Sequence, residues 1–500
     1  MINKMRVLKK DKLEKIKKVF RKKETILLIL ILVFGFFLRI YFLGHAPFWV
    51  DENISSIASK EILEKGIPKF DSGFMYLRAP VFHYSQALSF LIGGVDDFSA
   101  RFPSVIFGLL TIILAYYIGK EYSESGGLIA ALFVSVFYLE VFFSRQARFY
   151  QLFQLLFFLS LFLLYKSKNN RKYLYLSLVS FFLAISTHIQ ALILIPFFIF
   201  HILYYSKRKE KFFSLIPVIP LFTRLSGLFN SNSFSRSSSN GGPIGIFYLV
   251  NIKKYFNYLK GIWYYFVLFI PGMIWSYLKN KRLTILIVVP SLTVLIGVFT
   301  LKTFAFRYIY LFIFPLVLYC ALLFSYLYEK YGKIILFVMF AFILISSNIF
   351  ISSGYSNILA PVNEGFNFSS APRIDYKNIP EDLKQDINKN MVVTYFSPAT
   401  EWHIKKPDYI LPFSLIGFGN DSVSYNNSGG KIVDRYSGAR IINDLKGIKE
   451  EKFYFIVSSF ALGKIQKDQK ENIGLAVDDC SLKHSKETLN IWFCNKKDLI

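Results

Sequence analysis

The chain has 500 residues, of which 54% are hydrophobic and 18% aromatic, and its mean hydropathy is +0.41. This composition is more apolar than a soluble protein could solvate, so it excludes an ordinary soluble enzyme and indicates a membrane protein. The formal net charge of +26 lies in short Lys and Arg clusters between apolar runs, which is typical of membrane topology and argues against a nucleic-acid partner.

The chain begins with a basic stretch, residues 4–23, which precedes an apolar run at 25–43. That run is too long for the apolar core of a signal peptide, and no small-residue cleavage site follows it. We therefore expect a first membrane helix, with the basic residues 1–24 in the cytoplasm.

About eleven apolar runs have the length of a membrane helix, since about 20 residues cross a hydrocarbon core of about 30 Å. We therefore predict a polytopic α-helical membrane protein with about eleven transmembrane helices and a soluble C-terminal domain. The runs lie at 25–43, 101–119, 126–144, 149–165, 173–188, 189–205, 212–229, 258–278, 283–301, 308–327 and 333–352.

Charge in the connections favours an odd number of crossings. If the N-terminus is inside, four of the five expected inside loops are distinctly basic, as cytoplasmic loops usually are. These loops are 120–124, 166–172, 207–211, 279–282 and 329–333. We therefore expect a membrane domain at 25–352 in the cell membrane and an extracytoplasmic domain at 353–500.

Two outer segments, 44–100 and 230–252, are longer than simple turns. The first contains an amphipathic pattern that ends at Gly66 and predicts a helix along the membrane surface. The second is rich in Ser, Asn and Gly and is expected to be a mobile loop that gates a site. The apolar stripe of the helix consists of Ile54, Ile57, Ala58, Ile62 and Leu63.

From about Tyr355 the composition is that of a soluble domain. Strand-like runs at 391–396, 409–411, 453–457 and 489–493 alternate with helix-like runs at 381–387, 439–445 and 461–467, which predicts a small α/β domain. Cys480 and Cys494 flank a possible hairpin in this domain, and an oxidising compartment would allow them to pair; a disulfide is left open. Cys320 lies in an apolar run and is expected to be a buried thiol.

Two adjacent acids, Asp51 and Glu52, follow the first predicted helix. Charged groups at a membrane boundary are costly to desolvate and therefore need a reason. One carboxylate is a candidate general base for an acceptor hydroxyl, or a ligand for a divalent cation. The structural alternative is that Asp51 caps the amphipathic helix, and the residues alone leave both interpretations open.

Basic residues also gather on the predicted outer face, against the usual bias of membrane loops. Because an Arg guanidinium binds two phosphate oxygens at once, these cations are candidates for binding the phosphate of a lipid carrier. The alternative is that they extend to ordinary lipid head groups. The candidates are Arg78, Arg145, Arg148, Lys302 and Arg307.

Other polar groups on that face have weaker signatures. Glu140 is a candidate second acid, although we favour a salt bridge with one of the two arginines at 145–148. His45, His83 and His188 could form a metal site with the acids, but their spacing matches no ligand motif. A divalent cation is therefore left open, and no other cofactor is predicted.

Four features occur in one order along the chain: the Asp51-Glu52 pair, the Arg78-Ala79-Pro80 segment, the Ser144-to-Arg148 turn and the Arg307-Tyr308 pair that opens a helix. This set resembles the GT-C superfamily of membrane glycosyltransferases, in particular the lipid A aminoarabinose transferase and protein O-mannosyltransferase relatives of the family 39 type. The resemblance covers residues 25–352 and does not extend to the tail. It implies a GT-C-like membrane domain.

The resemblance further implies a polyprenyl-phosphate-linked sugar as donor, inversion at the anomeric carbon, and a glycan, lipid or protein as acceptor. Asp51 then occupies the catalytic acid/base position, Glu52 is its supporting neighbour, and the cations bind the donor phosphate. His83, Tyr308 and Glu140 are further candidate contacts to substrate. Arg78 departs from the pattern, since relatives often have Lys there, and Phe149-Tyr150 stand where many relatives place an acid.

A transporter or flippase of lipid-linked sugars is the main alternative from another class. Transporters tend to place charges near the middle of the membrane and to show paired repeats, whereas the charges here lie at one face and no repeat is evident. A signalling or assembly protein whose tail is the working part is a third hypothesis. Truncation after Ser353 would test it.

Overall fold

The computed structural model describes residues 23–205, 252–253, 255–256, 259–299, 306–346, 374–411, 424–426, 432–442, 448, 450–458, 480–486 and 489–495. The chain divides into two compact units, each built from segments that are distant in sequence. The helical unit comprises Met1–Tyr41, Ser104–Arg145 and Phe149–Ala360. The sheet unit comprises Phe42–Pro103, Gln146–Arg148 and Pro361–Ile500.

The helical unit contains apolar helices of membrane length. Within the described residues, three helical segments are long and apolar enough to cross a membrane: Asp97–Lys120 (α4), Lys281–Phe299 (α15) and Arg307–Tyr331, which contains α16 (Tyr310–Tyr331). Residues 97–103 of α4 belong to the sheet unit. Most of the predicted apolar runs therefore lie in helices where the structure describes them, whereas the run at 212–229 and residues 230–251 of the predicted loop at 230–252 lie outside the described residues.

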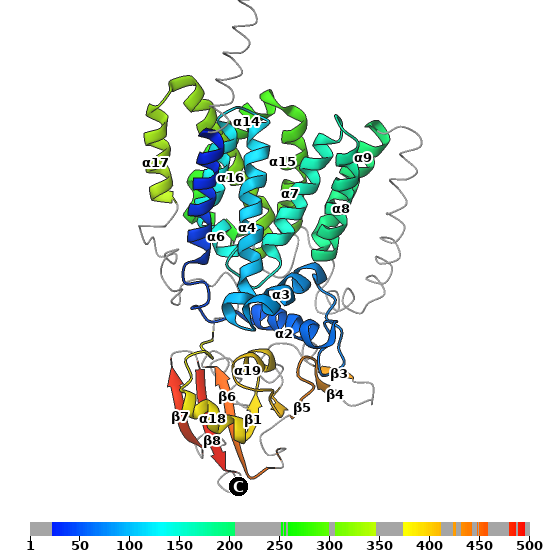
Figure 1. Ribbon diagram of the computed structural model, residues 1–500, viewed down its shortest axis with the longest axis vertical. Helices are drawn as coiled ribbons and strands as arrows, with labels where there is room; N and C mark the ends of the chain where they lie inside the picture. The colour runs from blue at the N-terminus through cyan, green and yellow to red at the C-terminus, as the bar shows by residue number, and fades with distance from the viewer. Residues whose placement is uncertain are drawn as a thin grey trace, which may run out of the picture. The chain divides into compact units, whose positions relative to one another are not determined.

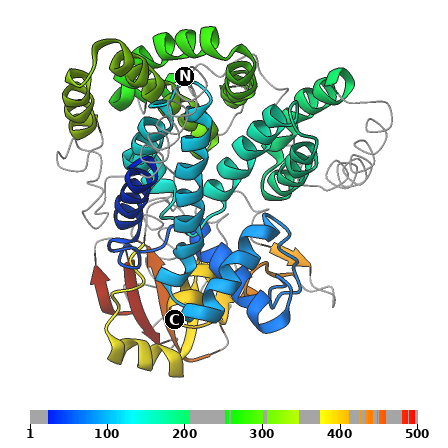
Figure 2. The same ribbon diagram turned by 45° about the horizontal axis from the view of Figure 1, so that its top comes forward.

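Shorter helices complete the described part of this unit, beginning with a helix at 23–40. In Figure 1, α14, α15 and α16 lie alongside one another, and Figure 2 shows α7 and α8 as a neighbouring pair. The shorter elements are α5 (Gly126–Val136), α6 (Tyr138–Phe143), α7 (Tyr150–Lys166), α8 (Lys172–Thr187), η1 (Ile189–Leu194), α9 (Ile195–Tyr205), η2 (Lys260–Ile262), α14 (Trp263–Lys279), η3 (Phe306–Ile309) and α17 (Ile334–Ser346).

The single helix predicted at 126–144 is wrong, because the chain breaks at Phe137, which is extended. A buried arginine compensates for the break. Arg39 donates from Nη1 to the Ser135 carbonyl at 2.8 Å and from Nη2 to the Val134 carbonyl at 3.2 Å. These carbonyls lie at the C-terminal end of α5, where the helix cannot satisfy them and where positive charge is favourable.

The sheet unit contains one mixed sheet with the strand order β3-β4-β5-β2-β1-β6-β8-β7. β1 pairs in parallel with β2 and β6, whereas β8 pairs antiparallel with β6 and β7 (Figure 1). The strands are β1 (Met391–Thr394), β2 (Tyr409–Ile410), β3 (Ser424–Asn426), β4 (Ile432–Asp434), β5 (Arg440–Ile441), β6 (Lys452–Ser458), β7 (Ser481–Lys486) and β8 (Leu489–Asn495).

Most described features of the predicted C-terminal domain are confirmed. All four strand-like runs form strands, and the run at 381–387 forms α18 (Glu381–Lys389). The helix-like run at 439–445 is wrong, since Arg440–Ile441 forms β5, and the run at 461–467 lies outside the described residues. Cys480 and Cys494 form a disulfide at the β7–β8 hairpin, and Cys320 is a buried thiol.

Four helices of the sheet unit matter for the site: α2 (Val50–Lys65), α3 (Pro80–Gly93), the start of α4, and α19 (Ser397–His403). Gly66 ends α2 with φ +74°, as predicted. Much of the apolar stripe is packed inside the unit: Ile54, Ile57 and Ala58 are buried in a core with strand residues such as Val393 and Phe455. These side chains of α2 therefore cover apolar residues of the sheet. Leu63, the last residue of the stripe, is 39% exposed.

Candidate active site

Glu52 is the centre of a buried polar network in the sheet unit. Its Oε1 accepts from Arg101 Nε at 3.0 Å and from the backbone N–H of Ala147 at 2.8 Å. Its Oε2 accepts from the Trp49 backbone at 2.8 Å and from Arg101 Nη2 at 3.3 Å. The side chain is 0% exposed. Glu52 therefore joins α2, α4 and the 146–148 turn, and this arrangement favours a positioning role.

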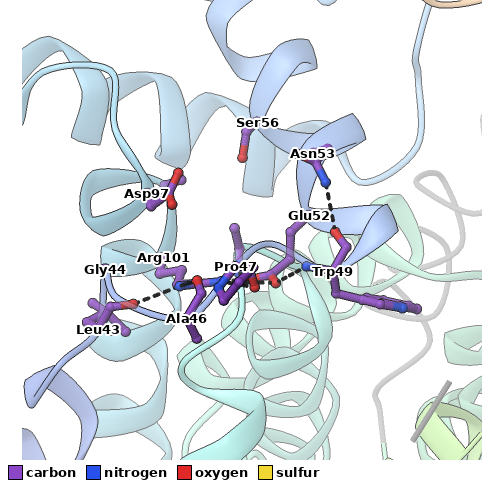
Figure 3. Close-up of polar contacts among 12 residues, drawn as sticks. Leu43, Gly44, Ala46, Pro47, Trp49, Glu52, Asn53, Ser56, Asp97 and Arg101 are labelled. Atoms are coloured by element: carbon purple, nitrogen blue, oxygen red, sulfur yellow. Dashed lines mark hydrogen bonds and ion pairs between the residues drawn. The ribbon is translucent and has the colours of Figure 1, made fainter. Parts of the chain in front are cut away.

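Arg101 completes this network on its other side. Nη1 donates to the carbonyls of Leu43 and Ala46, both at 2.8 Å, and Nη2 donates to the Pro47 carbonyl at 3.2 Å (Figure 3). The guanidinium also lies over the Phe48 ring, 4.8 Å from its centroid. One buried arginine thus fixes the segment that leads into the two acids.

Asp51 has a different environment from its neighbour. The N-cap of α2 is Trp49, so Asp51 lies in the first turn and the interpretation of Asp51 as the cap is wrong. Its Oδ2 instead pairs with Arg148 Nη2 at 3.2 Å, and its side chain is 21% exposed whereas that of Arg148 is 1% exposed. A ligand can therefore reach the carboxylate, which a buried cation holds in place.

Arg148 itself is oriented by two hydroxyl groups. Its Nη1 donates to Ser55 Oγ at 2.5 Å and to the Tyr76 hydroxyl at 3.3 Å. Ser55 lies one turn after Asp51 on α2, so residues four apart on one helix face both contact the same guanidinium. The pairing of Asp51 with Arg148 brings together a predicted acid and a predicted phosphate-binding cation that are 97 positions apart.

His83 lies beside this pair and is fully buried. Its ring is 5.3 Å from the Tyr76 ring, and neither ring nitrogen has a hydrogen-bond partner of ordinary geometry within the described residues. Burial, and then the charges of Arg148 and Arg78, lower the pKa of His83 from 6.5 to about 3. The His83 imidazole is therefore neutral and lies close to the positive charges of Arg148 and Arg78.

Arg78 is exposed and precedes a strained residue. Ala79, the N-cap of α3, has φ +50° and ψ +52°, in the left-handed region that side chains with a Cβ rarely adopt. Pro80 follows as the first residue of α3. Such strain costs on the order of 1–3 kcal/mol and tends to occur at functional sites. The segment with the predicted (Arg/Lys)-x-Pro pattern is therefore held in a specific conformation.

The C-terminal part of the chain contributes a turn, Asp434–Gly438, to the same unit. Tyr436 packs edge-on against Phe70 with ring centroids 5.4 Å apart. Burial raises the pKa of Tyr436, and so do the nearby Tyr76, Asp434 and Asp51, whereas the charge of Arg435 opposes the increase. The turn thus brings a phenol close to the candidate acid.

The other predicted cations lie in the helical unit or outside the described residues. Arg145 is partly buried and donates from Nη1 to the Leu38 carbonyl at 2.9 Å. Arg307 lies in η3, with its guanidinium 5.4 Å from the ring centroid of Tyr308. Lys302 lies outside the described residues. The structure therefore brings Asp51, Arg148 and His83 together and leaves the phosphate roles of these three cations as predictions.

Glu140 belongs to a buried network of the helical unit. Gln154 donates to its Oε1 at 2.9 Å, and the Tyr310 hydroxyl donates to its Oε2 at 3.1 Å. Tyr310 also hydrogen-bonds to Gln151, which in turn donates to Thr111. The donors to this acid are an amide and a phenol, whereas the sequence interpretation favoured a salt bridge with an arginine at 145 or 148.

The described residues offer little for a divalent cation. They contain no group of three or more His, Cys, Asp and Glu side chains that could hold a metal ion. His83 is surrounded by the charges of Arg148 and Arg78, which oppose a second positive charge there. His188 accepts a hydrogen bond from the Gln190 backbone through Nδ1.

Three contributors to this site were missed from the sequence. Arg101 lies inside an apolar run, where a charge was not assigned a role. Tyr76 is adjacent to the Arg78 segment, and its aromatic character offered no local signal for contact with Arg148. Tyr436 lies in the tail, which had no predicted role. Only the hydrogen bonds and packing of the folded unit reveal them.

Part of the sequence is similar to a known enzyme family. Residues 77–226 match the family model described as dolichyl-phosphate-mannose-protein mannosyltransferase. No curated protein sequence matches the chain. The matched part includes α3 through α9 and the 146–148 turn that carries Arg148.

The fold is similar to that of solved structures of ArnT from Cupriavidus metallidurans. The apo structure has a TM-score of 0.61 at 10% identity and covers 95% of this chain and 98% of that chain. The structure bound to undecaprenyl phosphate has a TM-score of 0.58 at 11% identity and covers 94% and 98%. This chain therefore has the fold of ArnT over nearly its whole length.

A second similarity is to AglB, the archaeal oligosaccharyltransferase of Archaeoglobus fulgidus, in complex with an inhibitory peptide and a dolichol-phosphate. Its TM-score is 0.50 at 14% identity, and the match covers 77% of this chain but 64% of that chain. This chain thus spans less than two thirds of the archaeal oligosaccharyltransferase. The AglB and ArnT comparisons therefore indicate the same fold for the part of this chain that they share.

Proposed function

We propose that this chain, a membrane glycosyltransferase of the GT-C fold, transfers one sugar from a polyprenyl-phosphate carrier to an acceptor hydroxyl with inversion at the anomeric carbon. The similar ArnT structure contains undecaprenyl phosphate, and the AglB complex contains a dolichol-phosphate. Both ligands join a polyprenyl chain to a phosphate. A donor of this chemical class therefore suits the present chain.

One observation carries the proposal: a partly exposed carboxylate, Asp51, is held at 3.2 Å by the buried guanidinium of Arg148. Transfer from a phosphate carrier needs a base for the acceptor and positive charge for the leaving group. Arg148 supplies charge beside Asp51, and the exposed Arg78 supplies a second cation on the His83 side. The groups that support the proposal all lie within the sheet unit.

The chemical step follows from these positions. The acceptor oxygen attacks the anomeric carbon while its proton passes to the Asp51 carboxylate, and the bond from that carbon to the phosphate oxygen breaks. The electron pair of the broken bond remains on the phosphate, whose charge the arginines stabilise. Attack opposite to the leaving phosphate inverts the configuration. Arg148 also orients Asp51.

The charge pattern and the disulfide support an extracytoplasmic site. Basic loops at alternate connections favour a cytoplasmic N-terminus, and eleven crossings would then place the C-terminal part outside. The Cys480–Cys494 disulfide belongs to the same unit as Asp51, and disulfides persist in oxidising compartments. These observations support our proposal that the sheet unit lies at the extracytoplasmic face.

Replacing Asp51 by Asn tests the role of the carboxylate. Asn keeps an oxygen that can accept a hydrogen bond from Arg148, but it cannot take a proton, so we expect transfer to fall by roughly 100- to 10,000-fold. Turnover is measured with a short-chain polyprenyl-phosphate sugar and the purified full-length protein, and the thermal midpoint is measured in parallel. The midpoint should stay close to that of the wild type.

Glu52→Gln is the matched comparison, because it removes the charge of the adjacent acid. Breaking its buried pair with Arg101 should cost about 3–5 kcal/mol of stability and lower the thermal midpoint. Glu64→Gln, at an exposed position of the same helix, controls for the loss of one negative charge. Wild-type turnover in Asp51→Asn would remove Asp51 from the mechanism, whatever the result for Glu52.

A further inference from the structure

A cavity of about 260 Å³ lies in the sheet unit and contains none of the groups that surround Asp51. Its walls come from α2, from the segment that leads into α4, from Lys377 and from α19. The polar and aromatic lining consists mainly of Lys60, Asp97, Lys377, Glu401, Trp402 and His403. It combines carboxylates, ammonium groups and an indole in a small volume.

One wall of the cavity is fixed by internal contacts. Trp402 donates from Nε1 to Asp97 Oδ1 at 2.8 Å, and Lys377 pairs with Asp97 Oδ2 at 3.3 Å. The Trp402 ring also stacks on Phe48, with centroids 5.5 Å apart. Burial lowers the pKa of His403 to about 4, so this ring is neutral at pH 7. Trp402, Asp97 and Lys377 therefore already have partners within the wall.

Glu401 differs from these residues, because its carboxyl group is incompletely hydrogen-bonded within the described part of the chain. Its Oε2 is buried and has no hydrogen-bond partner within the described residues. Burial, and then the charge of Asp71, raise the pKa of Glu401 to about 7. A buried carboxyl oxygen without a donor costs free energy, unless a ligand supplies the hydrogen bond.

Lys60 is a second group available to a ligand. It lies on α2 and is 43% exposed, and its ion pair with Glu64 is long, at 3.7 Å. An exposed pair of this kind contributes little stability, so the ammonium can turn toward a ligand at little cost. The cavity therefore offers an acceptor and a donor from different elements.

We propose that this cavity binds one sugar unit of the acceptor. Sugar hydroxyls both donate and accept hydrogen bonds, which suits a carboxyl group and an ammonium group that face the same volume. The mixed signs of charge disfavour a phosphate, which the carboxylates repel, and a bare cation, which the lysines repel. The volume is below the roughly 300–1,000 Å³ of drug-sized pockets, which limits the ligand to about one ring.

The role of that sugar as part of the acceptor rests on the proposed function, whereas binding itself does not. Asp51 and Lys60 both lie on α2, so the same helix carries the candidate base and one wall of the cavity. A sugar in the cavity would add affinity for the acceptor without taking part in the chemical step. Its loss should therefore raise the acceptor KM and leave kcat unchanged.

Binding is tested directly by saturation-transfer NMR on the full-length protein in a detergent without a sugar head group. The probes are the methyl glycosides of glucose, mannose, galactose and N-acetylglucosamine. We expect saturation transfer to at least one glycoside and an affinity at least tenfold weaker in Glu401→Leu. Because the Oε2 atom that leucine removes has no protein partner, the thermal midpoint of this variant should be retained or raised.

Glu381→Leu, at a 76% exposed side chain of the same unit, is the matched control and should bind like the wild type. In a transfer assay, Glu401→Leu should raise the acceptor KM at least tenfold with an unchanged donor KM. Absence of binding by the wild type to all four glycosides, or wild-type binding by Glu401→Leu, would overturn the proposal. Asp51→Asn separates the two proposals, since it should lose transfer and still bind the glycoside.

Discussion

Neighbouring acids on α2 have different environments because each faces a different part of the sheet unit. Glu52 receives four hydrogen bonds from three separate segments and has no capacity left for a ligand. Asp51 pairs with Arg148 and remains 21% exposed. At the scale of single residues, access to solvent decides which carboxylate can exchange a proton with a substrate. The side chain of Glu52 instead determines where Asp51 lies.

The burial of His83 predicts how the stability of the protein depends on pH. Its pKa is about 3 in the folded protein and about 6.5 when unfolded, so the unfolded state binds more protons between these values. Stability contributed by the neutral ring is therefore present above pH 6.5 and is lost as the pH falls toward 3. At pH 5 the loss is on the order of 2 kcal/mol.

The measurement is the thermal midpoint of the wild type and of His83→Gln from pH 7.5 to pH 4.5. Gln does not titrate, so the midpoint of the variant should fall less steeply below pH 6.5. His45→Gln, at an exposed position of the same unit, should follow the wild-type curve. Parallel curves for His83→Gln and the wild type would show that His83 is not held neutral by burial.

At the scale of elements, the turn at Asp434–Gly438 shows how the tail reaches the candidate site. Asp434 accepts hydrogen bonds from Ser397 Oγ and from the Ser437 backbone, both at 2.7 Å. Gly438 follows with φ +72°, and a Cβ there would lie 3.2 Å from the backbone of Ser72. The close approach holds Tyr436 next to the 70–76 segment.

Gly438→Ala should therefore disturb this turn by two effects, strain at positive φ and contact with Ser72. We expect a stability loss of at least about 1–2 kcal/mol and a raised donor KM, because Tyr76 and Arg148 shift with the segment. Gly66→Ala is the control, since Gly66 has φ +74° but no atom within 4 Å of the added Cβ. Equal effects of the two substitutions on the donor KM would contradict a specific role for the turn.

Elements with a regular apolar pattern could be predicted from the sequence, and long-range polar contacts could not. The run at 149–165 became α7 (Tyr150–Lys166) because a predominantly apolar run of this length favours a helix at membrane depth. The break at Phe137 was missed because Arg39, about 95 residues away, supplies the hydrogen bonds that make it tolerable. Asp51 and Arg148 were predicted to share one reaction centre on the outer face, but a direct ion pair between them was not predicted. No local pattern states that residues 97 positions apart meet.

At the scale of the whole molecule, the sheet unit is assembled from three separate parts of the chain. Ile54 and Ile57 of α2 and Phe70 of the outer loop share one apolar core with tail residues such as Tyr376 and Val392. Trp402 of the tail stacks on Phe48, next to the acids. The outer loop therefore cannot bury its apolar side chains without the tail, and the tail is part of the fold that positions Asp51.

Truncation after Ser353 should consequently abolish donor binding rather than leave a working core. The truncated chain would expose Ile57 and Phe70, each 1% exposed in the intact protein, so residues 44–100 should become sensitive to limited proteolysis. A full-length protein cut at a protease site inserted after Ser353 is the control, since the shared core should retain the severed tail. Titration with a short-chain polyprenyl-phosphate sugar compares both proteins. Wild-type affinity in the truncated protein would mean that the tail is dispensable for the site, and the core between α2 and the sheet would then have no role in holding Asp51.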